Sequence, residues 1–145
     1  MPSTDALGPD PDTASLISHA HLLVSRRVSE AVAAAGFRAK PSYGAVFALL
    51  RPEGSRLSDL AREAQVSPQA MGELVDELEG LGYLVRTADP ADRRAKLIRL
   101  TALGRRCDAA AGRAIAALER DLDRVLGERG HQQLRRSLSR LLDQG

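Results

Sequence analysis

The residues best suited to bind a partner are basic side chains gathered in one stretch of the chain. From residue 83 to residue 113 there are eight lysines and arginines against three aspartates, whereas the whole chain carries a net charge of only +2. Arg93, Arg94 and Lys96 form the densest part of this stretch. Guanidinium and ammonium groups pair with phosphate, so the position of the charge, more than its total, points to a nucleic-acid backbone.

A second set of candidate residues lies at the start of a helix predicted for residues 67–81. Ser67 is expected to cap this helix, Pro68 to take its first position and Gly82 to follow its end. Its early outward side carries Ser67, Gln69, Ala70, Gly72 and Glu73. Gln can pair with adenine, Glu can accept from cytosine and Ala can touch the methyl group of thymine. An ordinary exposed helix face explains these residues equally well, and the helix holds four acidic and no basic residues.

These residues need elements that hold them side by side. A short helix is predicted for residues 58–64 with Ser58 as its cap, and Gln65 and Val66 separate it from the helix at 67–81. Two strands are predicted at residues 83–87 and 96–100, joined by a polar loop over 88–95. Two helices followed by a hairpin make a winged helix-turn-helix. Its second helix fits the major groove of DNA, and its basic hairpin tip reaches the minor groove.

Long amphipathic helices flank this unit. Apolar residues recur at helical spacing over residues 13–35, and Gly36 ends that helix. A short apolar helix is predicted for 42–50. Thr101 is expected to cap a helix that continues to about residue 126, where Gly127 and Gly130 interrupt it before a last helix. The flanking apolar stripes are too long for the central unit to cover, which predicts a homodimer.

The predicted fold class is therefore mainly α with a small β-hairpin wing (α+β). Residues 1–13 are expected to form a disordered tail, and residues 14–145 a single domain. The DNA-binding lobe covers about 42–100, and the dimerisation helices cover about 14–35 and 102–143.

Several other functions find no support in the sequence. There is no glycine-rich phosphate loop, nucleophile elbow or pair of carboxylates in an apolar setting, so neither an enzyme nor a cofactor is expected. No apolar run is long enough to span a membrane, and the start of the chain lacks a signal core, which favours the cytoplasm.

His19 and His21 do not share a helix face, so no metal site with His131 is predicted. Cys107 lies on an apolar stripe and is interpreted as a buried inert thiol rather than a redox sensor.

The hairpin and its neighbours carry a resemblance to a known family. The stretch from Asp89 to Thr101, DPADRRAKLIRLT, resembles the wing signature of the MarR family of bacterial regulators. LSDLA at 57–61 and LVDELEGLGY at 74–83 are similar to that family's helix-turn-helix, and the order of helices matches from about Ser15 to Leu142. The chain departs from many relatives at Gly72 and Glu73, where a basic or more polar recognition helix is common.

The resemblance implies a DNA-binding transcriptional regulator, more often a repressor, that binds a pseudo-palindromic operator on double-stranded DNA as a homodimer. Arg94 would enter the minor groove while Asp92 steadies the hairpin, and Arg93, Arg86 and Lys96 would add wing contacts. Many members release DNA when a small aromatic or phenolic effector binds between the lobes, and His21, Tyr43 and Phe47 are the candidates for that pocket here. The alternative, motivated by the acidic recognition helix, is a winged-helix adaptor that binds proteins and not DNA.

Overall fold

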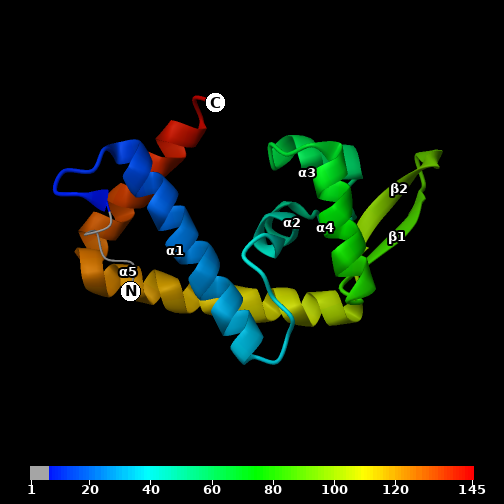
Figure 1. Ribbon diagram of the computed structural model, residues 1–145, viewed down its shortest axis with the longest axis horizontal. Helices are drawn as coiled ribbons and strands as arrows, with labels where there is room; N and C mark the ends of the chain where they lie inside the picture. Colours follow the sequence, from blue (N-terminus) through cyan, green and yellow to red (C-terminus); the bar gives the residue numbers. More distant parts are fainter. Residues whose placement is uncertain (1–6) are drawn as a thin grey trace.

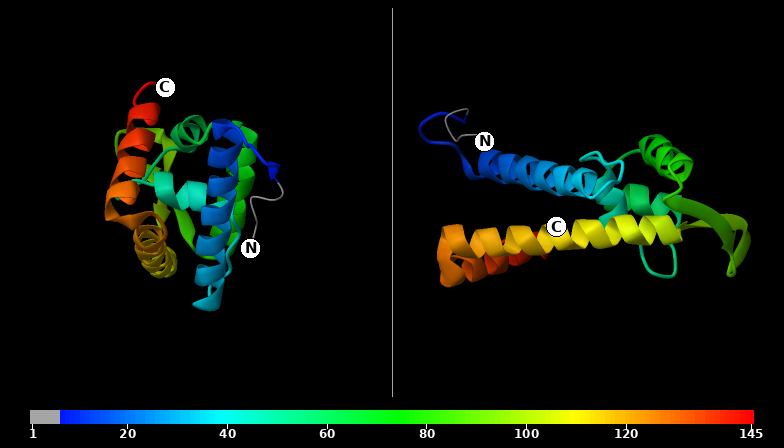
Figure 2. Two further views of the ribbon diagram at one scale, coloured as in Figure 1. Left: turned by 90° about the vertical axis from the view of Figure 1, so that its left-hand side faces the viewer. Right: turned by 90° about the horizontal axis from the view of Figure 1, so that it is seen from below.

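The computed structural model describes residues 7–145 and has the predicted class, with five helices and one two-stranded hairpin within that range (Figure 1). The elements in chain order are α1 (Thr13–Ala34), α2 (Tyr43–Leu49), α3 (Leu57–Glu63), α4 (Pro68–Gly80), β1 (Leu84–Asp89), β2 (Asp92–Leu100) and α5 (Ala102–Leu142). Helices α2 to α4 and the hairpin form one lobe, while α1 and α5 contact each other, cross, and extend away from it (Figures 1 and 2). The predicted tail lies partly outside the described residues, and residues 7–12 precede α1.

Capping side chains set where the longer helices begin. The Ser67 hydroxyl accepts a hydrogen bond from the Ala70 amide, and Pro68 is the first residue of α4, as predicted. Thr101 likewise accepts from the Gly104 amide and starts α5. The prediction that Ser58 caps the third helix is wrong. Helix α3 begins one residue earlier, because the backbone of Ser55 pairs with Ile98 of β2 and the extended Arg56 becomes the residue before the helix.

The hairpin is longer and its tip tighter than predicted. Strands β1 and β2 pair from Leu84 with Leu100 out to Ala88 with Lys96, and the last pair, Asp89 with Asp92, leaves a turn of only two residues, 90 and 91. The predicted loop over 88–95 is therefore wrong. The register shift after Ala88 leaves residues 93–95 without partners on β1, so they form a bulge. The aspartates and the proline of this segment build a tight turn followed by the bulge.

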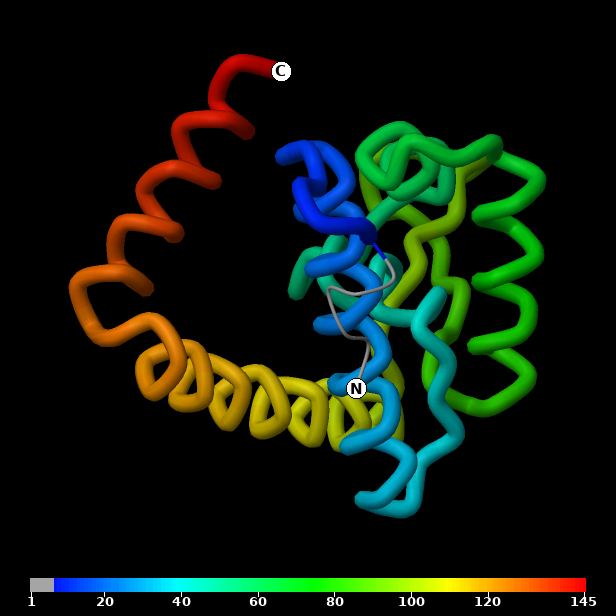
Figure 3. The backbone as a smooth tube through the Cα atoms, turned by 60° about the vertical axis from the view of Figure 1, so that its left-hand side comes forward, coloured from blue at the N-terminus to red at the C-terminus, as the bar shows by residue number. Residues whose placement is uncertain are grey.

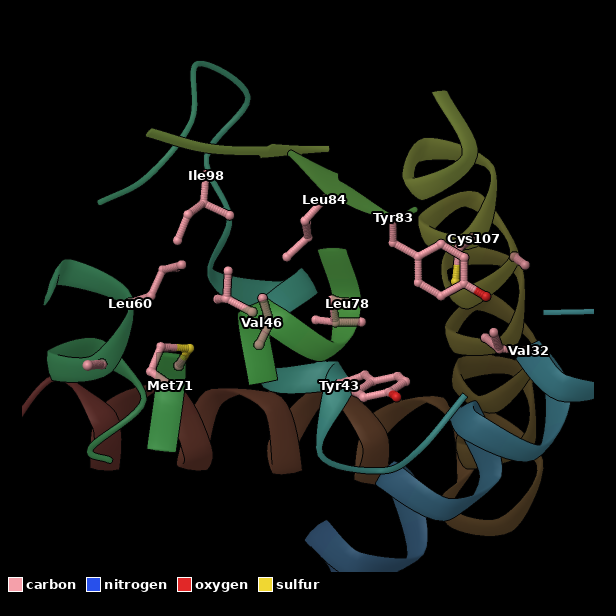
Figure 4. Packing of buried hydrophobic residues seen from close by; sticks show 13 residues of the cluster. Val32, Tyr43, Val46, Leu60, Met71, Leu78, Tyr83, Leu84, Ile98 and Cys107 are labelled. Atoms are coloured by element: carbon pink, nitrogen blue, oxygen red, sulfur yellow. The ribbon is translucent and has the colours of Figure 1, made fainter. Parts of the chain in front are cut away.

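One apolar core joins the helix-turn-helix to the hairpin. Its most buried side chains are Val46, Leu60, Met71, Val75, Leu78 and Ile98. Tyr83 and Cys107 extend this core toward α5 and Val32 of α1, so α5 and the lobe share a continuous packed interior (Figure 4). Burial, with a smaller effect of Asp108, raises the pKa of the Cys107 thiol, which keeps the sulfur protonated and agrees with its interpretation as a buried thiol.

Helix α5 contains a sharp bend at Gly127, whose φ of 71° and ψ of 156° are not helical. The predicted interruption is confirmed there, whereas Gly130 lies within the helix. The chain after the bend turns away from the first part of α5 (Figure 3). His131 is buried at this corner, with its Nδ1 2.7 Å from Asp123 Oδ1 and its Nε2 3.4 Å from Glu119 Oε2. Within residues 7–145 no group of side chains suited to hold a metal ion occurs.

Apolar side chains remain exposed mainly on α1 and α5. Of the thirteen large apolar residues exposed in the described chain, only Val66 and Val85 lie outside these two helices. Leu22 on α1 is 62% exposed, and Val125 and Leu142 on α5 are each 77% exposed. Such a concentration exceeds the scattered apolar exposure of ordinary protein surfaces. Over the described range, no helix has the length and apolar character needed to cross a membrane.

Candidate nucleic-acid interface

The first turns of α4 present the predicted base-reading residues outward. Ser67, Gln69, Ala70 and Glu73 are exposed and Gly72 is half-buried, while Met71, Val75 and Leu78 point into the core. The Ser67 hydroxyl is engaged as the helix cap, which leaves Gln69 and Glu73 as the polar side chains free to project from this face. The side-chain amide of Gln69 lies 3.5 Å from Glu73 Oε1, a long and weak contact.

The acidic residues later in α4 are neutralised by cations from other elements. Lys40, in the chain before α2, pairs with Glu77. Arg86 of β1 donates to Asp76 and Glu79, each at 2.8 Å. Only Glu73 among the four carboxylates of this helix therefore lacks a cationic partner within residues 7–145. The helix is far less repulsive to phosphate than its composition suggests.

The guanidinium of Arg86, for which a wing contact with DNA is predicted, lies in ion pairs with α4. Its guanidinium joins the hairpin to the end of α4, and its side chain is 31% exposed. A group that already bridges two carboxylates is poorly placed to bind DNA, because it would have to abandon both pairs. The ion pairs of Arg86 hold β1 against α4, and its contact with DNA stays a prediction.

The tip of the hairpin carries the free positive charge. Arg93 and Arg94 lie in the bulge and are exposed, and neither makes an ion pair with any residue in the described part of the chain. Lys96 is also exposed, at the last regular pair of the hairpin. Asp92 Oδ1 accepts from the Arg94 amide at 3.0 Å and so holds the bulge in shape. This contact agrees with the steadying role that the family resemblance implied for Asp92.

An ion pair between a buried carboxylate and a partly exposed arginine lies behind the tip, and the sequence alone does not predict it. Asp89 is 7% exposed, and its Oδ2 accepts from Nε and Nη2 of Arg56 at 2.9 and 2.7 Å. The amide of Ala91 donates to Oδ1, and this contact together with Arg56 holds the pKa of Asp89 below its ordinary value. Arg56 and Asp89 are 33 residues apart. A local pattern cannot reveal such a pair, and the sequence predicts only a polar loop at Asp89.

The three residues predicted for an effector pocket are not brought to one cavity. Tyr43 is buried in α2, Phe47 is half-buried with its ring centroid 6.3 Å from that of Tyr83, and His21 is exposed on α1. Two surface cavities, of about 440 and 420 Å³, lie elsewhere, at the bend of α5 and between the wing and the start of α3. The effector residues remain a prediction.

Tyr43 is expected to ionise at unusually high pH. Burial, followed by its hydrogen bond to Glu77, raises the pKa of Tyr43 to about 12. Because this folded-state value lies above that of an unfolded tyrosine, near 10, its contribution to stability is complete below about pH 10 and is lost as pH rises toward 12. The chain has two tyrosines and no tryptophan, so tyrosinate absorbance in a Tyr83→Phe variant reports Tyr43 alone. A midpoint near 10 in a protein that keeps its helical circular dichroism would contradict this assignment.

These features define a class of protein: a winged helix-turn-helix with an exposed cationic wing beside a groove-sized helix, and two long amphipathic helices outside that lobe with exposed apolar residues. A sequence model of the MarR family matches residues 40–95. The structure of CouR from Rhodococcus jostii RHA1 bound to p-coumaroyl-CoA is 32% identical, with 90% of this chain and 91% of that chain covered and a TM-score of 0.71. The chain belongs to the MarR family, whose members are transcriptional regulators and not enzymes.

Two further solved structures extend the comparison. A MarR-family transcriptional regulator from Rhodococcus sp. RHA1 is 31% identical over 87% of this chain and 90% of its own, with a TM-score of 0.69. The repressor CouR bound to a 23-mer DNA duplex is 28% identical over 90% of this chain and 92% of its own, with a TM-score of 0.75. No curated protein sequence matches the chain significantly.

Proposed function

We propose that the protein is a ligand-responsive repressor that binds a pseudo-palindromic operator as a homodimer in the cytoplasm, and that it has no enzymatic activity. The observation that carries this proposal is the exposure of Arg93 and Arg94, neither paired with an acid within residues 7–145, on the hairpin that lies beside α4 (Figure 1). Narrow minor grooves attract such groups, and the early residues of a recognition helix read base edges in the major groove. The similar CouR has been solved on a DNA duplex.

A homodimer supplies the second half of the interface. The exposed apolar residues of α1 and α5 need a covering surface, and a second copy offers the same surface in return. Two wings and two recognition helices related by two-fold symmetry then match half-sites about one helical turn apart. Sedimentation of the protein should accordingly give a dimer mass at micromolar concentration.

An aromatic or phenolic effector fits the family relationship. CouR binds p-coumaroyl-CoA, which carries a phenolic group on a coenzyme A thioester. We propose that the aromatic group of the effector binds in the dimer around Tyr43 and Phe47, next to Tyr83. Phenolic acids and their coenzyme A thioesters are the probes to test first, by thermal shift and by release of DNA.

The adaptor alternative rested on the acidity of α4, and that argument is weaker because Lys40 and Arg86 neutralise three of the four carboxylates. Fluorescence anisotropy with duplexes from the region upstream of the protein's own coding sequence separates the two functions. The repressor proposal expects tight binding that weakens as salt rises. Failure to bind any duplex at low salt, with the dimer intact, would favour the adaptor.

Gly72→Ala tests whether the early face of α4 meets DNA. A Cβ at Gly72 would have no atom within 4 Å in the free protein. Alanine in place of a helical glycine should therefore raise the unfolding free energy by roughly 0.5–1 kcal/mol. If this face lies against base edges, the added methyl group should weaken operator binding by about tenfold. Denaturant unfolding and anisotropy measure the two effects separately.

Gly80→Ala is the matched control on the same helix. Its Cβ would also have open space, but Gly80 is the last residue of α4, far from the proposed contact. We expect a small gain in stability with unchanged DNA affinity. Equal operator affinity for the two alanine variants would argue against placing the first turns of α4 in the groove.

A further inference from the structure

The hairpin tip is held to another element by the ion pair between Asp89 and Arg56. Asp89 ends β1, next to the two-residue turn, and its side chain is engaged on both oxygens. Oδ2 accepts from two nitrogens of Arg56, and Oδ1 accepts from the Ala91 amide. An ion pair with this many hydrogen bonds and little exposure of the carboxylate has a defined geometry, unlike an exposed surface pair.

Arg56 occupies a position that can define the direction of the hairpin. It directly precedes α3, and its neighbour Ser55 exchanges two backbone hydrogen bonds with Ile98 of β2, at 3.0 and 2.8 Å. The Ser55 bridge holds the hairpin at Ile98, the partner of Arg86 near the middle of β1, and the Arg56 side chain holds it again at Asp89, near the tip. Two points of attachment on one short segment set the angle between the wing and α3, which packs against α4.

The backbone ladder of the hairpin is interrupted just below the tip. Regular pairing ends at Ala88 and Lys96, and the bulge at residues 93–95 interrupts the ladder just where the exposed arginines lie. Arg86 ties β1 to α4 only at the middle of the strand. Asp89 is therefore the outermost residue through which another element can orient Arg93 and Arg94.

We infer that Arg56 and Asp89 are positioning residues for DNA binding: their ion pair orients the wing so that Arg93 and Arg94 reach the minor groove while α4 lies in the major groove. This inference rests on the proposed function. Neither residue needs to touch DNA in this role. This role explains why a carboxylate lies so close to the wing. The charge of Asp89 alone repels phosphate, but the residue contributes to DNA binding by orienting the wing.

Opposite charge changes give the sharpest test. Asp89→Asn removes a negative charge and Arg56→Gln a positive one, so a purely electrostatic effect would tighten DNA binding in the first and weaken it in the second. The positioning role predicts that both variants bind DNA more weakly, on the order of tenfold.

Arg56→Lys keeps the charge but loses the two-nitrogen contact, and we expect roughly a threefold loss of DNA affinity. Glu53 is an exposed acid that lines the cavity between the wing and the start of α3. Glu53→Gln is therefore the control and should bind DNA equally well or slightly tighter.

A second measurement reports the wing without DNA. Amide hydrogen exchange at Ala91 and across the bulge should accelerate in the Asp89→Asn and Arg56→Gln variants, but not in Glu53→Gln, while the core of α4 stays protected. In a protein that already carries Arg93→Ala and Arg94→Ala, Asp89→Asn should cause no additional loss of affinity, because the groups that it positions are gone. A merely structural role would lower affinity equally in both backgrounds.

The outcomes separate this inference from the proposed function. Tighter DNA binding by Asp89→Asn, or unchanged exchange of the wing amides, would overturn the inference even if the wild-type protein binds DNA tightly. Wild-type protein that binds no duplex would overturn the proposed function, and with it any role of the pair in DNA binding. Faster exchange in the variants would then still support the ion pair as the contact that holds the tip.

Discussion

Alanine at both Arg93 and Arg94 is expected to weaken operator binding by about 100-fold or more, through the loss of four guanidinium groups from the dimer. Both side chains are exposed in the bulge of the hairpin, and no carboxylate of the described chain neutralises them. Each phosphate-region contact that is lost should flatten the dependence of log affinity on log salt by about 0.9, hence by about three to four units in all. Anisotropy titrations over a series of salt concentrations measure the slope and the affinity together.

The control for this change removes the same charge elsewhere. Arg129 and Arg140 are exposed on the part of α5 beyond the Gly127 bend, at the end of the molecule opposite the hairpin (Figure 1). Alanine at these two positions alters the net charge equally but should leave the salt slope within about one unit of the wild type. Parallel salt slopes for the two double variants would show that net charge, and not the wing, accounts for the affinity.

Local chemistry made much of this fold predictable from the sequence. Ser67-Pro68 and Thr101 place a hydroxyl just before a helix, and both cap as expected, because a cap depends on residues only three positions apart. The apolar spacing of Met71, Val75 and Leu78 likewise identified the buried face of α4. Such signals lie within one element, so they can be seen before any tertiary contact is known.

The errors arose where contacts between distant residues decide the structure. Ser58 has the right residue type for a cap, but pairing of Ser55 with Ile98, more than forty residues away, determines where α3 starts. The family resemblance implied a wing contact for Arg86, and the carboxylates of α4 that engage it lie on a different element. The same pairs removed the apparent conflict between an acidic recognition helix and DNA.

The effector pocket was beyond reach for a further reason. A site between two lobes of a dimer depends on how the copies meet, and neither spacing nor composition encodes that geometry. Tyr43 is buried in the core of the lobe and Phe47 packs near Tyr83, and their part in an effector site stays a prediction. Only the aromatic character of that region was predictable.

Gly104→Ala is expected to be the most damaging single methyl group that can be added to the protein. Gly104 lies in the first turn of α5, and a Cβ there would sit 2.0 Å from the carbonyl oxygen of Tyr83 and 3.1 Å from the side chain of Leu100. The Tyr83 carbonyl cannot retreat easily, because it also accepts from the amide of Thr101 at 3.0 Å and from its hydroxyl at 3.2 Å. Alanine must therefore push α5 away from the base of the hairpin.

That displacement should cost about 3 kcal/mol or more of unfolding free energy, as expected when a backbone atom and not a flexible side chain is in the way. Denaturant unfolding of Gly104→Ala, compared with Gly112→Ala on the same helix, measures the cost. A Cβ at Gly112 has no atom within 4 Å, so its variant should gain roughly 0.5–1 kcal/mol. The two substitutions are chemically identical and differ only in the close approach of α5 to Tyr83, the residue just before the hairpin. If Gly104→Ala were as stable as Gly112→Ala, α5 could not pack against the hairpin as described, and the wing would lose its rigid connection to the helices that we propose for dimerisation.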